Sequence, residues 1–232
     1  SSIFKGSPNL NSIIFRQGSS YRFDGSAVYK GNELIFVCPA ARTYDLPSEV
    51  ESIHSLAFDI AKDLIEITCV ENARYSAYHG ILLDKECKNI VAVPWSISEI
   101  RIPGSITQLD GSKFIDSEGN RVSVDIFVWD APSISLGNHT TLIANKIVLK
   151  SSSNIELGMR AIGGIGELSL IAKNEIKLIS SSIEQSKLIY FSSAGVDVDA
   201  KEGAFKTENL CIQPSSGISF NYYLEKFDKT QC

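Results

Sequence analysis

Apolar residues recur in pairs along the second half of the chain, with one residue between the two members of each pair. The pairs begin 21, 21, 20 and 22 residues apart, and each has a companion pair eight residues further on. Alternation with a period of two is typical of a strand with one buried face, so each period predicts two short strands around a corner. The pairs are Ile126/Val128, Ile147/Leu149, Leu168/Leu170, Leu188/Tyr190 and Leu210/Ile212, and the companions are Ile134/Leu136, Ile155/Leu157, Ile176/Leu178, Val196/Val198 and Ile218/Phe220.

This period of about 21 residues predicts that residues 120–232 form a β-solenoid. A single coil cannot bury its own apolar stripe, whereas stacked coils pair their strand edges and align their aliphatic side chains. Residues 222–229 are charged and are predicted to form a C-terminal cap on the last edge. A coil length of about 22 residues throughout the 232 residues would give about ten turns. An antiparallel β-sandwich also contains short alternating strands, but it does not require a constant recurrence.

A longer repeat occupies the first half of the chain. Four apolar or aromatic positions recur 54 residues later: Phe4, Leu10, Ile13 and Tyr21 correspond to Phe58, Leu64, Ile67 and Tyr75. Further matches follow at offsets of 55 and 56, including the Pro47/Pro103 pair. Residues 1 to about 115 therefore contain about two copies of one unit.

Residues 44–58 and 100–114 share an Ile-Pro or Leu-Pro step followed by spaced Val, Ile, Leu and Phe. This pattern, together with the inserts at residues 23–39 and 75–94, resembles the repeat of BspA-like leucine-rich-repeat proteins. The later coils resemble the right-handed β-helices of haemagglutinin-type adhesins. The expected fold class is mainly β: a solenoid in which leucine-rich repeats (residues 1–119) continue into a right-handed β-helix-like stack (residues 120–232).

The resemblance implies a non-catalytic protein-recognition or adhesion module of a surface-exposed or secreted repeat protein. The implied partner is a protein, a host-matrix component or a cell-surface ligand, and no cofactor or catalytic residue is implied. Two alternatives stay open. One is a structural stalk that carries another domain, and the other is a polysaccharide-acting β-helix enzyme that would use the clustered carboxylates of Asp197, Asp199 and Glu202.

Charge and composition exclude several other classes. The net charge is −5 and no run of Lys or Arg occurs, which argues against nucleic acid as a partner. No apolar stretch approaches the length of a transmembrane helix, so no membrane insertion is expected in this segment. The chain begins with Ser rather than Met, which is typical of an excised or processed piece.

Cysteines and histidines predict no metal site. The five cysteines form no C-x-x-C pair, and the three histidines lie far apart in the sequence. The odd number of cysteines argues against a complete disulfide framework. Cys38 and Cys69 end apolar, strand-like runs, where a free thiol is expected to be a small buried residue.

Aromatic residues give the best candidates for binding. Tyr78, Trp95, Tyr29 and Tyr44 lie in or beside the inserts and outside the alternating core pattern. Exposed Tyr and Trp side chains offer a large contact area at a low entropic cost. The competing interpretation is that aromatic residues of the inserts pack the inserts onto the solenoid.

One further motif concerns modification. Asn138-His139-Thr140 has the sequence of an N-glycosylation acceptor, which is used only in a secretory pathway that contains the glycosylating enzyme.

Overall fold

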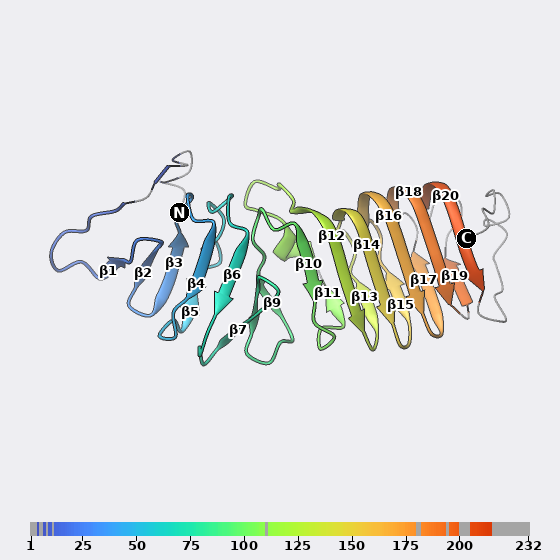
Figure 1. Ribbon diagram of the computed structural model, residues 1–232, viewed down its shortest axis with the longest axis horizontal. Coiled ribbons are helices and arrows are strands. Elements are labelled where there is room, and N and C mark those ends of the chain that lie inside the picture. The colour runs from blue at the N-terminus through green and yellow to red at the C-terminus, as the bar shows by residue number, and fades with distance from the viewer. Residues whose placement is uncertain are drawn as a thin grey trace. The chain divides into compact units, whose positions relative to one another are not determined.

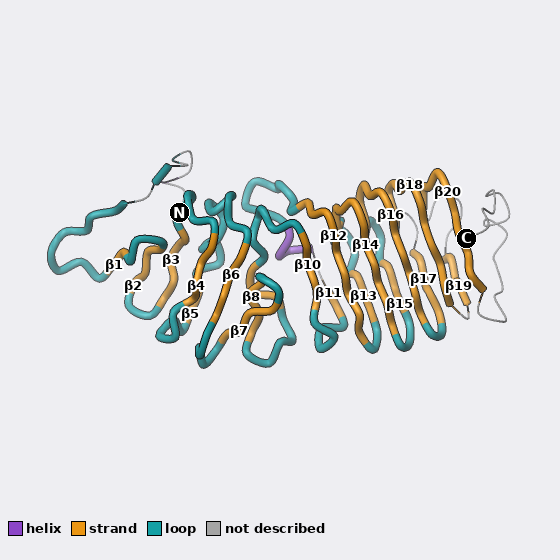
Figure 2. Tube along the Cα trace, in the orientation of Figure 1, coloured by secondary structure: helices purple, strands orange, loops and turns teal. Residues whose placement is uncertain are grey.

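The structure is a computed structural model that describes residues 4, 7, 9–10, 12–109, 111–179, 182–193, 195–199 and 205–214. The chain is mainly β and forms a β-solenoid of about 7 turns (Figures 1 and 2). It divides into two compact units: unit 1 comprises residues 1–98 and 115–120, and unit 2 comprises residues 99–114 and 121–232. The sequence-based boundary at 119/120 falls within the short segment that returns to unit 1.

The expected ten turns are wrong because the two inserts of unit 1 use residues without adding a turn. Each insert is a three-stranded antiparallel meander. The strands of the first are β1 (Tyr21–Phe23), β2 (Ala27–Lys30) and β3 (Glu33–Val37), and those of the second are β7 (Tyr75–Tyr78), β8 (Ile81–Asp84) and β9 (Ile90–Ala92). Gly25 and Gly80 make the first turn of each meander with φ angles of +101° and +81°, which a side chain would disfavour. The repeat read from the sequence is therefore confirmed.

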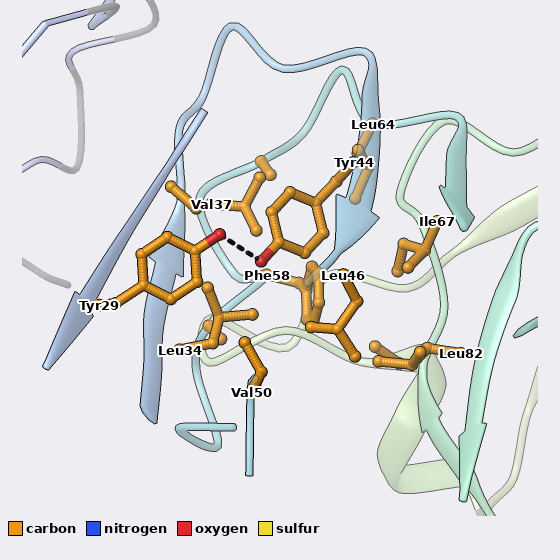
Figure 3. Close-up of a cluster of buried hydrophobic side chains, with 14 residues drawn as sticks. Tyr29, Leu34, Val37, Tyr44, Leu46, Val50, Phe58, Leu64, Ile67 and Leu82 are labelled. Carbon is orange, nitrogen blue, oxygen red and sulfur yellow. Dashed lines mark hydrogen bonds between the residues drawn. The ribbon is translucent and has the colours of Figure 1, made fainter. Parts of the chain in front are cut away.

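Parallel strands lie between the inserts of unit 1. β4 (Thr43–Leu46) pairs with β6 (Glu66–Cys69), and β3 pairs with the short β5 (Ser52–Ile53). Register alignment places Tyr44 beside Ile67, and both side chains point into the core of this unit. Figure 3 shows that core, which also contains Tyr29, Leu34, Val37, Leu46, Val50, Phe58, Leu64 and Leu82.

Asn72 lies just after β6, and its side-chain amide makes five hydrogen bonds to backbone groups. Its Nδ2 donates to the carbonyl oxygens of Pro47 (2.9 Å), Val50 (2.9 Å) and, at 3.3 Å, Ser48. Its Oδ1 accepts the backbone N–H groups of Arg74 (2.8 Å) and Tyr75 (3.1 Å). Asn72 is 1% exposed, so one side chain satisfies the buried backbone groups of two successive loops.

Unit 2 consists of two parallel sheets whose strands alternate along the chain. The six-stranded sheet contains β10 (Glu99–Ile102), β12 (Ser123–Ala131), β14 (Leu142–Ser151), β16 (Ile162–Ala172), β18 (Ile183–Ser193) and β20 (Phe205–Pro214). The five-stranded sheet contains β11 (Gln108–Leu109), β13 (Ile134–Leu136), β15 (Ile155–Leu157), β17 (Glu175–Ile179) and β19 (Gly195–Asp199). Each strand pairs with the strand one coil away, and the parallel pairing excludes the antiparallel sandwich. The 3-10 helix η2 (Gly111–Phe114) precedes β12.

The alternation was assigned to the wrong phase in two coils. Ile126 is 36% exposed, whereas the buried pair of β12 is Phe127 and Trp129. In β18, Ile189 and Phe191 are likewise buried, whereas Tyr190 of the expected pair is only partly buried. Residues 125 and 126 of β12 are both exposed, so the inward phase restarts one position later. The buried ladder Phe127, Ile147, Leu168, Ile189 therefore has spacings of 20, 21 and 21 residues.

The companion pairs lie as expected in three coils. Ile134/Leu136, Ile155/Leu157 and Ile176/Leu178 are buried and stacked in register. The backbone of Val196 and Val198 continues the same ladder in β19. Ile218/Phe220 and the cap expected at residues 222–229 lie outside the described residues.

Candidate functional site

Tyr29 and Tyr44, two of the four candidate binding residues, lie in the core of unit 1. They are 0% and 2% exposed, and their hydroxyl groups are 2.9 Å apart (Figure 3). The Tyr29 hydroxyl also lies 2.6 Å from Asp24 Oδ2, to which it donates. The expected exposure of both rings is therefore wrong. Sequence alternation could not reveal that the phenol groups have buried hydrogen-bond partners. These hydrogen bonds offset the desolvation cost of burying the two hydroxyl groups.

Ionisation in this network is fixed at neutral pH. Burial alone would raise the pKa of Asp24, but hydrogen bonds from Tyr29, Ser26 and Ala27 outweigh it and lower the pKa below its ordinary value. Burial raises the pKa of both Tyr29 and Tyr44 well above the ordinary value. Asp24 is therefore a carboxylate and both phenols are neutral at neutral pH, and the hydrogen bonds among them hold the core in place.

Trp95 is partly buried and held on two sides. Its Nε1 donates to the Phe58 carbonyl oxygen at 3.1 Å, and Lys62 Nζ lies 3.7 Å from the ring centroid. Lys62 Nζ in turn lies 2.6 Å from Asp116 Oδ2, whose side chain is buried. The cation–π contact covers one face of the indole ring, and the ion pair of the same lysine holds Asp116, so the structure gives Trp95 a packing role.

Tyr78 is the candidate that offers its ring to solvent. It ends β7, is 37% exposed, and makes an edge contact with the ring of His79 at 4.5 Å. The following turn lies against β6, because Gly80 O accepts the N–H of Ile67 at 2.9 Å. A Cβ at Gly80 would lie 3.6 Å from Glu66 Cγ, so the turn and the outer face of β6 are immediate neighbours.

The outward side chains of β4 and β6 extend this surface. Thr43, Asp45 and Glu66 are exposed, and Thr68 is partly exposed. Thr68 Oγ1 donates to Asp45 Oδ1 at 2.8 Å, which shows that the two strands present these side chains on one face. We call Thr43, Asp45, Glu66, Thr68 and Tyr78 the β4–β6 face.

Sequence analysis found only Tyr78 of this face. The other four residues are polar positions next to the inward-facing Tyr44, Leu46 and Ile67. Such alternation is found on any half-buried strand, so it indicates exposure without indicating a site. A usable signal would have been the parallel pairing of the two strands, which brings Asp45 beside Thr68.

Two of the three carboxylates that the enzyme alternative would use lie at ordinary strand positions. Asp197 and Asp199 lie in β19, where their backbone registers beside Lys177 and Ile179. Their side chains, and the whole of Glu202, lie outside the described part of the chain. Among the described residues, no group of three or more His, Cys, Asp or Glu side chains is arranged to hold a metal ion.

Cysteines occur in both oxidation states. Cys38 is a buried free thiol, as expected, and Cys69 and Cys87 are partly buried thiols that form no disulfide bond. Burial raises the pKa of the Cys38 and Cys69 thiols above the ordinary value, which keeps them protonated. Cys211 in β20 is disulfide-bonded. In the described part of the chain, no helix has both the length and the apolar character needed to span a membrane.

Comparison with known proteins adds one structural likeness. The sequence matches no protein-family model and no curated protein. Among solved structures it is similar to the pneumococcal vaccine antigen PcpA, with 12% sequence identity and a TM-score of 0.41. The match covers 78% of this chain and 56% of that one, so this chain corresponds to little more than half of the PcpA chain. This likeness assigns neither a family nor an activity.

Proposed function

We propose that this chain is a non-catalytic protein-recognition or adhesion module of a surface-exposed or secreted repeat protein, and that the β4–β6 face contacts the partner. The observation that carries the proposal is that exposed Tyr78 lies two residues before Gly80, whose turn contacts Glu66 on the outer face of β6, in a unit with a packed core. Tyrosine is enriched at the centre of protein interfaces, and polar residues form the rim around it.

Asn72 supports the leucine-rich-repeat interpretation of unit 1. Residues 64–72 read Leu-x-x-Ile-x-Cys-x-x-Asn, which fits the consensus spacing L-x-x-L-x-L-x-x-N of such repeats. In that consensus the spaced apolar residues point inward, as Leu64 and Ile67 do here. Residues between them point outward, which assigns Glu66 and Thr68 to the exposed strand face of the repeat.

The disulfide bond at Cys211 supports an extracellular location. Structural disulfides form and persist in oxidising compartments, which include the secretory lumen, the periplasm and the cell surface.

A binding experiment tests the proposal. The probes are immobilised fibronectin, laminin and type I collagen, together with fixed epithelial cells, each titrated with wild-type protein. Truncation of a central aromatic residue commonly costs more than about 1.4 kcal/mol, so Tyr78→Ala is expected to weaken binding by about tenfold or more. Tyr21→Ala is the matched control, because Tyr21 is 40% exposed and lies on β1, away from this face.

Three outcomes would contradict the proposal. Equal binding of the two variants would reject the β4–β6 face as the site. Absence of binding by the wild type would favour the structural stalk. Cleavage of a glycan panel that is lost in an Asp197→Asn, Asp199→Asn double variant would show that the module is an enzyme.

A further inference from the structure

We propose that Asn138 is an N-glycosylation site, modified when the chain passes through a secretory pathway. The tripeptide Asn138-His139-Thr140 is the only Asn-x-Ser/Thr tripeptide in the sequence. The enzymes that attach oligosaccharides to asparagine recognise this tripeptide when the middle residue is not proline. The inference concerns unit 2 and is independent of the β4–β6 face.

The structure places Asn138 at a corner of a coil, between β13 and β14. Asn138 and His139 are both exposed. Asn138 Oδ1 accepts the backbone N–H of Met159 on the next coil at 2.8 Å. Its Nδ2, the atom that would carry the sugar, has no hydrogen-bond partner among the described residues. Thus the amide oxygen makes a structural contact, and the amide nitrogen of this exposed residue remains available.

The neighbouring backbone leaves room for this arrangement. Gly158 lies directly against Asn138, and a Cβ there would come within 2.6 Å of Asn138 Oδ1. His139 and Thr141 have φ angles of +59° and +48°, so the chain turns at this corner instead of continuing a strand. Asn138 lies outside the paired residues 134–136 of β13, so a glycan on it does not replace a group in the ladder between β13 and β15.

The reaction is a transfer from a polyprenyl-diphosphate-linked oligosaccharide. Nδ2 forms a bond to the anomeric carbon of the sugar, and the bond between that carbon and the diphosphate oxygen breaks. The lipid diphosphate leaves with the electron pair, and Nδ2 loses one of its two protons. Oδ1 is untouched, so its hydrogen bond to Met159 is retained after modification.

Burial of Thr140 determines whether modification occurs before or after folding. Thr140 is fully buried, and its Oγ1 donates to the Gly137 carbonyl oxygen at 2.7 Å. The glycosylating enzyme therefore cannot reach the Thr140 hydroxyl once this corner has packed, and transfer of the sugar to Asn138 must precede folding of the coil. For this reason the experiment uses protein synthesised inside cells.

The test expresses the full chain behind a heterologous signal peptide in a human cell line and analyses the secreted protein by intact mass and peptide mapping. Wild-type protein is expected to carry a glycan that peptide N-glycosidase removes, converting residue 138 to aspartate. Asn138→Asp keeps the Oδ1 acceptor for Met159 and is expected to lose the glycan completely while remaining secreted.

Glu156→Thr in the Asn138→Asp background is the positive control, because it creates an acceptor tripeptide at exposed Asn154 in the same unit. Glycan on the wild type and on this control, but not on Asn138→Asp alone, supports the assignment. Unmodified wild type together with a modified control overturns it.

Discussion

Replacement of Asn72 by alanine tests how unit 1 is held together. The side-chain amide makes four hydrogen bonds of ordinary length, to the carbonyls of Pro47 and Val50 and to the N–H groups of Arg74 and Tyr75. A net value of about 0.5–1.5 kcal/mol for each gives roughly 2–6 kcal/mol for the set. Water can hydrogen-bond to some of the backbone groups that lose Asn72 as a partner, so we expect Asn72→Ala to lower the free energy of unfolding by about 3 kcal/mol.

The assay is urea denaturation followed by circular dichroism, combined with hydrogen exchange at the amides of Arg74 and Tyr75. Exchange separates local opening of the loop from global unfolding. Asn89→Ala is the matched control, because Asn89 is exposed and its Nδ2 makes one side-chain bond, to Asp84 Oδ2 at 2.6 Å. We expect a loss below about 1 kcal/mol for the control. Equal losses for the two variants would refute the conclusion that Asn72 organises the loops.

Three further predictions concern packing and charge. Phe127→Ala is expected to lower the free energy of unfolding by about 3–5 kcal/mol and Ile126→Ala by less than about 1 kcal/mol, because only the Phe127 side chain is buried. Thermal melts in the reverse order would show that Ile126 is the inward residue, as the alternation in the sequence predicts. Leu149→Asp should unfold unit 2 while Ser152→Asp leaves its melting temperature unchanged, since Leu149 is 0% exposed and Ser152 faces solvent. Burial alone would raise the pKa of Asp116, but its bonds to Lys62, Asn120 and Glu118 lower it well below the ordinary value. Stability from this group is therefore present above about pH 4 and lost as the pH falls. Asp116→Asn should reduce stability at pH 7 and flatten its acid dependence in pH-dependent urea titrations, and an unchanged acid profile would contradict this.

The solenoid could be predicted because stacking repeats the same burial at the same interval. Ile147, Leu168 and the companion pair Ile155/Leu157 lie inward as the alternation indicates. The phase of β12 could not be predicted, because Ile126 and Phe127 are both apolar and local sequence does not show where two consecutive residues face outward. Only the pairing of Phe127 with Ile147 selects the inward residue.

The candidate site was less accessible to sequence reasoning. Tyr78 could be found because it lies outside the core pattern, and it is exposed. Tyr29 and Tyr44 met the same criterion and are buried, since their hydroxyl groups bind each other across 15 residues of sequence. A polar tip on an aromatic ring thus signals a surface position only when no buried partner exists, and that partner is defined by the tertiary fold.

The parallel register of unit 2 also governs how its length can change during evolution. Ile147 and Leu168 occupy equivalent positions one coil apart, so deleting or duplicating the 21 residues 148–168 preserves every inward side chain further along the chain. An insertion of a single residue within a strand would instead turn all following side chains of that strand to the opposite face. Tolerated length changes should therefore come in whole coils, each changing the height of the stack by about 4.8 Å. Variation in the number of coils between related genes would therefore change the length of the stack.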